Sequence, residues 1–167
     1  MTAENLNQAL AEGDLDRALA LAVEQVKGQP GDAGRRSMLF QLSAVTGDWA
    51  RAEKQLDMVG SLDPAALDFV SDYKAAIAAE KTRAEVLAGT ASPPIFGDPA
   101  PWVAKMAEAL RLDGLGEAAA AHDLRDEAME AAQAVPGAAN GTAFEWIADA
   151  DQRFGPIVEC VLNGEYH

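Results

Sequence analysis

The sequence predicts an all-α protein whose first half is a repeated helix pair. Alanine, the strongest helix former, occurs 36 times in 167 residues, whereas aromatic residues make up only 6%. Apolar residues recur at helical spacing, for example at Phe69, Val70, Tyr73 and Ile77. A third observation is an internal similarity at a shift of 34 residues, a period typical of stacked helical repeats.

The predicted repeat consists of two segments that have the same turn and helix-end residues at the same positions. Both contain Gly-Asp followed by Arg-Ala, at 13–18 and 47–52, and both close on a proline, at Pro30 and Pro64. Glycine suits the left-handed residue that ends a helix, and aspartate suits the cap of the next one. Ala18 and Ala52 are small where two helices must approach closely. This pattern resembles the tetratricopeptide repeat (TPR).

The turn and helix-end residues of the repeat predict a first domain at residues 1–89. A third Gly-Asp turn is missing at Lys81-Thr82, so the last helix, with Asp63 as its cap, is expected to close the array. The predicted helices cover 3–12, 14–28, 32–46, 48–60 and 64–88.

The second predicted domain, residues 90–167, opens with a loop that contains Pro93-Pro94. A helix starting at Asp98-Pro99 and another over 116–134 form a predicted pair. Past the loop signals Pro136-Gly137 and Asn140-Gly141, we expect a short helix near Asp149. Gly155-Pro156 should break it, and a final amphipathic helix should carry Ile157, Val158, Val161 and Leu162.

The net charge disfavours some classes of partner, and the cysteine content excludes some kinds of site. The net charge is −14, with 13 basic and 27 acidic residues, which disfavours nucleic acid and anionic membranes. Cys160 is the only cysteine, so one chain can form neither a disulfide nor a cysteine metal site. We expect Cys160 to be a small buried hydrophobe. No cofactor motif is present in the sequence, and the expected compartment is the cytoplasm.

The last third of the chain carries the most specific pattern. It reads Pro-Gly, then Gly-x-x-Phe-x-Trp-x-x-Asp-x-Asp-x-Arg-x-Gly-Pro-x-x-Glu, and closes with Gly-x-Tyr. The signature positions are Gly141, Phe144, Trp146, Asp149, Asp151, Arg153, Gly155, Pro156, Glu159, Gly164 and Tyr166. This string closely resembles the ImpE/TagJ family, also called SciE-type proteins, of type VI secretion loci.

The resemblance implies a non-enzymatic, cytoplasmic adaptor of the type VI secretion machine. Family members bind a helix of the small contractile-sheath subunit and associate with the sheath-recycling AAA+ ATPase. They continue after the signature with a Trp-x-Pro motif and a smaller β-rich region, so the chain is expected to be the helical part of a longer protein. His167 is either native or the start of a tag.

Two other functions compete with the adaptor. One is a generic helical-repeat scaffold that self-associates. The other is an enzyme that uses Asp149 and Asp151 for acid–base or metal chemistry. The spacing of Asp149 and Arg153 instead favours an intrahelical ion pair. Phe144 and Trp146 are expected to pack into the core, with an interface role as the alternative.

A partner groove can be placed on the repeats. In a TPR array the first helix of each pair lines the concave face, which is suited to a helix or strand of a partner. The predicted groove positions are Asn7, Leu10, Gln41, Val45, Ser71 and Ala75.

Overall fold

The computed structural model describes residues 5–167, which form two compact units that divide between Ile77 and Ala78, inside a long helix. We call them the repeat unit and the C-terminal unit. The all-α prediction is confirmed, because helices dominate the described residues and strands are limited to two short hairpins. No described helix is long and apolar enough to span a membrane.

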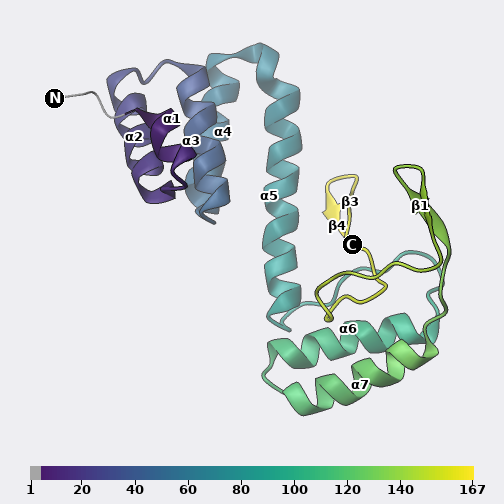
Figure 1. Cartoon of the computed structure of the whole chain (residues 1–167). Coiled ribbons are helices and arrows are strands. Elements are labelled where there is room, and N and C mark those ends of the chain that lie inside the picture. The colour runs from purple at the N-terminus through teal and green to yellow at the C-terminus, as the bar shows by residue number, and fades with distance from the viewer. Residues whose placement is uncertain (1–4) are drawn as a thin grey trace. The chain divides into compact units, whose positions relative to one another are not determined.

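The repeat unit is a row of antiparallel helices, each in contact with the next (Figure 1). The predicted start of the first helix, at Ala3, lies outside the described residues. The helices are α1 (Leu6–Ala11), α2 (Leu15–Gly28), α3 (Ala33–Val45), α4 (Trp49–Leu62), the 3-10 turn η1 (Pro64–Ala66) and α5 (Leu67–Leu87), of which residues up to Ile77 belong to this unit.

The turn and cap residues of the repeat adopt the conformations that the sequence predicts. Gly13 and Gly47 have positive φ angles of 73° and 75°. The Oδ1 atoms of Asp14 and Asp48 accept hydrogen bonds from backbone N–H groups three residues later, at 3.1 and 3.0 Å. Ala18 and Ala52 are fully buried. These local contacts fix the angle at which each helix pair turns.

Two clusters of buried side chains hold the repeat unit together. The first joins α1, α2 and α3, and the second joins α3, α4 and α5 around Phe40. The Phe40 ring meets Phe69 and Tyr73 edge-on, with centroids 5.9 and 5.1 Å apart. Trp49, directly after the Gly47-Asp48 turn, packs against this second cluster.

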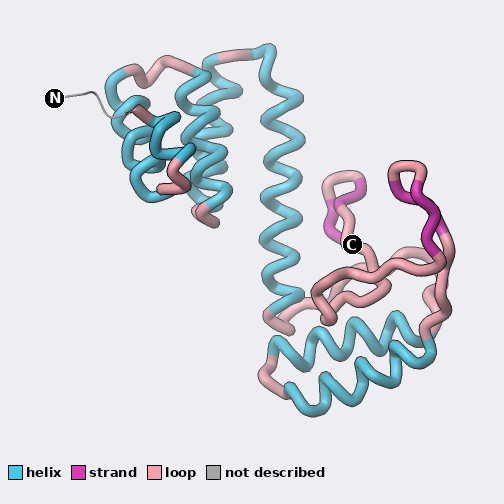
Figure 2. Tube along the Cα trace, in the orientation of Figure 1, coloured by secondary structure: helices cyan, strands magenta, loops and turns pink. Residues whose placement is uncertain are grey.

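The C-terminal unit pairs two helices beneath a long non-helical segment (Figure 2). The helices α6 (Pro101–Gly114) and α7 (Ala118–Ala131) pack against each other. Two antiparallel hairpins follow, β1 (Gly137–Ala139) with β2 (Thr142–Phe144), and β3 (Val161–Leu162) with β4 (Glu165–Tyr166).

Two predicted helices of this unit are wrong. Residues 146–149 have no regular secondary structure, turns follow over 152–156, and residues 157–160 are again irregular and lead into the strand β3. This strand ends in a hairpin because Asn163 and Gly164 both adopt positive φ, at 52° and 83°, as a tight two-residue turn requires. Cys160 and His167 close it by exchanging backbone hydrogen bonds of 3.0 and 2.9 Å.

Candidate functional site

The predicted groove positions of the repeat unit are accessible to a partner. Four of them are exposed and two are half-buried. Val45 is the most open apolar one, with 69% of its surface exposed. Leu10 packs partly against the first core cluster, so it could contribute only one edge to a partner. The exposed positions are Asn7, Gln41, Val45 and Ser71, and the half-buried ones are Leu10 and Ala75.

The acidic signature residues build a tight turn rather than a helical ion pair. Asp149 Oδ1 accepts a 2.7 Å hydrogen bond from the backbone N–H of Asp151, and the Asp149 N–H donates to the Gly155 carbonyl, also at 2.7 Å. The predicted Asp149–Arg153 pair is therefore wrong. Arg153 instead binds Asp151, with Nη2 2.6 Å from Oδ2 and Nε 3.0 Å from Oδ1.

This pairing commits Asp151 to a structural role. Hydrogen bonds from the Arg153 side chain, and then from its backbone N–H, lower the pKa of Asp151 to about 2. A carboxyl group that stays ionised at neutral pH and is occupied by a guanidinium is a poor proton donor. No group of side chains suited to hold a metal ion occurs among residues 5–167.

Gly155 lets the turn press against the helices below it. Its φ is 56°, and a Cβ atom there would lie 2.9 Å from Met129 Sδ and 3.2 Å from Met106 Cε. Pro156 follows directly and ends any helical continuation. The signature Gly-Pro thus places the next residues over α6 and α7.

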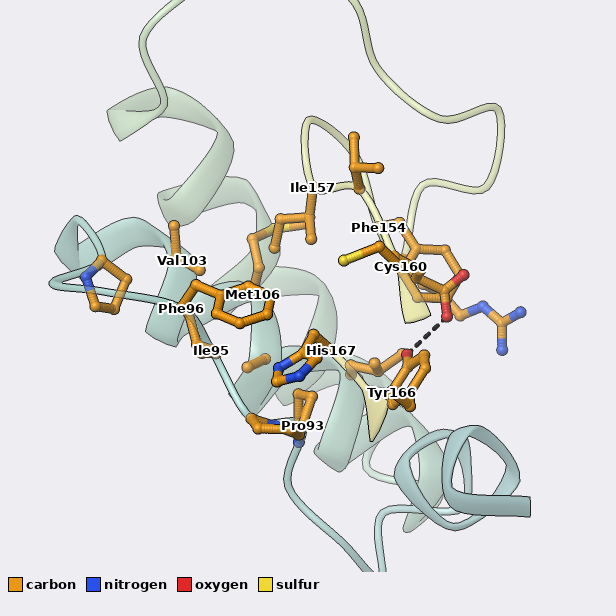
Figure 3. A pocket seen from close by; sticks show the side chains of 17 residues that line it. Pro93, Ile95, Phe96, Val103, Met106, Phe154, Ile157, Cys160, Tyr166 and His167 are labelled. Carbon is orange, nitrogen blue, oxygen red and sulfur yellow. Dashed lines mark hydrogen bonds between the residues drawn. The ribbon is translucent and has the colours of Figure 1, made fainter. Parts of the chain in front are cut away.

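Glu159 connects three parts of the C-terminal unit. Its carboxylate accepts hydrogen bonds from Arg83 of α5, at 2.7 and 3.2 Å, and from the Tyr166 hydroxyl of β4, at 2.7 Å (dashed in Figure 3). Arg83 also lies 5.8 Å from the centre of the buried Phe154 ring. The hydrogen bond to Glu159 raises the pKa of Arg83, and burial, followed by the bond to Glu159, raises the pKa of Tyr166.

Beside this network lies an apolar pocket of about 320 Å³ (Figure 3). The proline-rich loop, α6, the Phe154–Cys160 segment and the chain's last two residues form its walls. Phe96 stacks on His167 with ring centroids 3.9 Å apart, and Met106 forms part of the α6 wall. The pocket fits an apolar side chain, because its charged lining groups, Arg153 and Glu159, are already paired with other residues.

Neither Phe144 nor Trp146 belongs to a buried core cluster of the described residues. Phe144 is half-buried and its ring covers Gly137, where a Cβ would lie only 2.6 Å from Phe144 Cζ. Trp146 is 65% exposed, so the core prediction is wrong for it. It lines a shallow hollow with Trp102. Cys160 was expected to be buried and is exposed, because its segment is irregular rather than helical.

Sequence reasoning missed Arg83, Phe96 and Val158 as site residues. Arg83 and Glu159 are 76 positions apart, and no local pattern in one sequence links them. Val158 carries a usable signal, since Ile157, Val158 and Val161 are β-branched residues, which favour an extended segment over a new helix.

Comparisons with known proteins agree with both units. The tetratricopeptide-repeat family matches residues 9–80. Over 166 residues, 99% of the chain, the sequence is 49% identical to the type VI secretion system accessory component TagJ of Pseudomonas aeruginosa. A crystal structure of a Vibrio parahaemolyticus protein superposes with a TM-score of 0.85 at 28% identity, covering 96% of this chain.

The chain spans only part of each relative, 58% of TagJ and 61% of the Vibrio protein. Within that span the agreement extends from α1 through the signature. Over nearly its whole length the chain is therefore similar to the type VI secretion accessory component TagJ, and residues 9–80 match the tetratricopeptide-repeat family.

Proposed function

We propose that this chain is a non-catalytic accessory protein of a type VI secretion system, located in the cytoplasm. It binds a helix of the small contractile-sheath subunit and links that subunit to the sheath-recycling AAA+ ATPase. The observation that carries the proposal is the 49% identity over 99% of the chain to a type VI secretion accessory component. A repeat unit of paired helices supports it, because such units commonly bind a peptide or helix of another protein.

The site proposed for the sheath helix is formed by the six predicted groove positions, which lie on α1, α3 and α5. Val45 is its most exposed apolar residue, and Gln41 is an exposed polar neighbour one helical turn earlier on α3. A mixture of apolar and small polar groups suits one side of an amphipathic helix.

Calorimetric titration with the N-terminal helix peptide of the cognate sheath small subunit tests this proposal. We expect a Kd near 1 µM, about −8 kcal/mol. Val45→Lys should weaken binding about tenfold, because it removes an apolar contact and buries a charge. Val158→Lys makes the same change at an exposed valine of the C-terminal unit and serves as the matched control. Equal weakening by both variants, or no binding of the unmodified chain, would contradict the proposed site.

A further inference from the structure

Adjoining hollows border the non-helical segment of the C-terminal unit. Three hollows, of about 240, 280 and 320 Å³, follow one another along it. The first two share Ile147 and Pro156, and the last two share Ile157 and Val158. We call this surface the signature groove, because the Trp146–Tyr166 stretch of the family signature supplies most of one wall.

Large apolar side chains stand open along the signature groove. The exposed fraction is 78% for Val158, 70% for Val135 and 65% for Trp146. Isolated exposed hydrophobic residues are ordinary, but a run of them around connected hollows is typical of a binding surface. Tryptophan is also among the residues that contribute most to protein–protein affinity.

The charges at the groove that have no ion-pair partner are carboxylates. Asp149 lines the second hollow, and the exposed Glu130 and Glu145 stand next to Met129 and Trp146 in the sequence. None of the three forms an ion pair with a residue in the described range 5–167. Arg153, which lines the groove, is already compensated by Asp151 at 2.6 Å. A partner therefore meets a mainly apolar surface with carboxylates that have no ion-pair partner within residues 5–167.

We propose that the signature groove is a second docking site, which takes a basic amphipathic segment of a protein partner. The apolar side of that segment fills the hollows, and its lysine or arginine side chains face the bordering carboxylates. An acidic segment would place like charges together, and so would a second copy of this chain, whose net charge is −14. The inference stands on the C-terminal unit alone and does not depend on what the repeat unit binds.

A designed peptide tests the chemistry without a known partner. The probe has about 18 residues, with leucine at helical spacing and lysine elsewhere, and its control replaces every lysine by glutamate. Binding is followed by tryptophan fluorescence in Trp49→Phe, where the remaining tryptophans, Trp102 and Trp146, both line the groove. We expect the lysine peptide to bind with a blue shift and the glutamate peptide to bind at least tenfold more weakly.

Matched variants locate the site. Val158→Lys should weaken the lysine peptide about tenfold, whereas Val45→Lys, with the same change of charge, should leave its affinity within about twofold. Equal effects of the two variants would overturn the proposal in favour of diffuse attraction to an acidic protein. Equal binding of both peptides would overturn the charge argument. A concentration-dependent dimer in light scattering that Val158→Lys abolishes would assign the groove to a second copy instead.

The two valine variants also separate this inference from the proposed function. If Val45→Lys alone weakens the sheath helix and Val158→Lys alone weakens the lysine peptide, both stand. If the sheath helix does not bind at all while the lysine peptide shows the expected pattern, only the proposed function fails.

Discussion

Replacing Glu159 by glutamine should loosen the C-terminal unit measurably. The carboxylate accepts two hydrogen bonds from Arg83 and one from Tyr166. Glutamine has the same shape but only one acceptor oxygen, and its amide N–H group would face a donor. Tyr166 is only 6% exposed, so its hydroxyl has little access to water as a substitute partner.

The magnitude follows from these contacts. A hydrogen bond to a charged group contributes about 1.5–3 kcal/mol, and an exposed ion pair about 0–1 kcal/mol. The side chains of Arg83 and Glu159 are 34% and 25% exposed, between these limits, so solvent screens part of the attraction. We therefore expect Glu159→Gln to lower the free energy of unfolding by about 2 kcal/mol.

Urea unfolding in a Trp49→Phe background measures this effect, because the two remaining tryptophans both report on the C-terminal unit. A double-mutant cycle with Arg83→Met should give a coupling of about 1 kcal/mol. Lys105→Met, which breaks an exposed pair of the same unit with side chains 41% and 62% exposed, is the control and should cost at most about 0.5 kcal/mol. A Glu159→Gln loss no larger than that control would refute the reasoning.

Three further changes have distinct expected outcomes. Gly155→Ala should cost about 1–3 kcal/mol, since alanine resists a φ of 56° and its Cβ would press on Met129; unchanged urea stability would show that the turn relaxes freely. Asp48→Ala should destabilise the repeat unit by about 1 kcal/mol through loss of the α4 cap, as thermal melting by circular dichroism can test, with Asp48→Asn as the variant that retains the cap. Asp151 has its pKa lowered to about 2, so its pairing with Arg153 should stabilise the fold fully above pH 4 and lose that contribution as pH falls through 2. Carboxyl NMR titration should give that midpoint, and Arg153→Gln should move it back toward 3.8; a midpoint that the substitution leaves unmoved would contradict the assigned cause.

The repeat unit could be predicted from the sequence because its signals are local. Gly47 and Asp48 each act on backbone atoms within a few residues, so their identities alone determine a helix end and a helix start. The same is true of Asp63, whose Oδ1 caps η1 through the Ala65 N–H at 3.0 Å. The helical spacing of apolar residues then predicts which face of each helix is buried.

The C-terminal third could not be predicted equally well, for two different reasons. One signal is local: Asn140-Gly141 and Asn163-Gly164 both form the two-residue turns of hairpins, with positive φ at each residue, so Asn-Gly here indicates a hairpin and not only a loop. The other information was not local at all. The Glu159 network needs Arg83 from a helix 76 residues away, and the pocket needs the proline-rich loop.

The exposure of Trp146 separates two kinds of signature residue. Asp151, Arg153 and Gly155 have their side chains or backbone committed to the turn, and Glu159 is committed to Arg83 and Tyr166. Trp146 has no such commitment, yet burying a tryptophan would contribute more to stability than leaving it 65% exposed. The turn therefore holds Trp146 at the surface at a cost to the isolated chain. The proposed docking of a partner segment in the signature groove would cover Trp146 and so recover part of that cost.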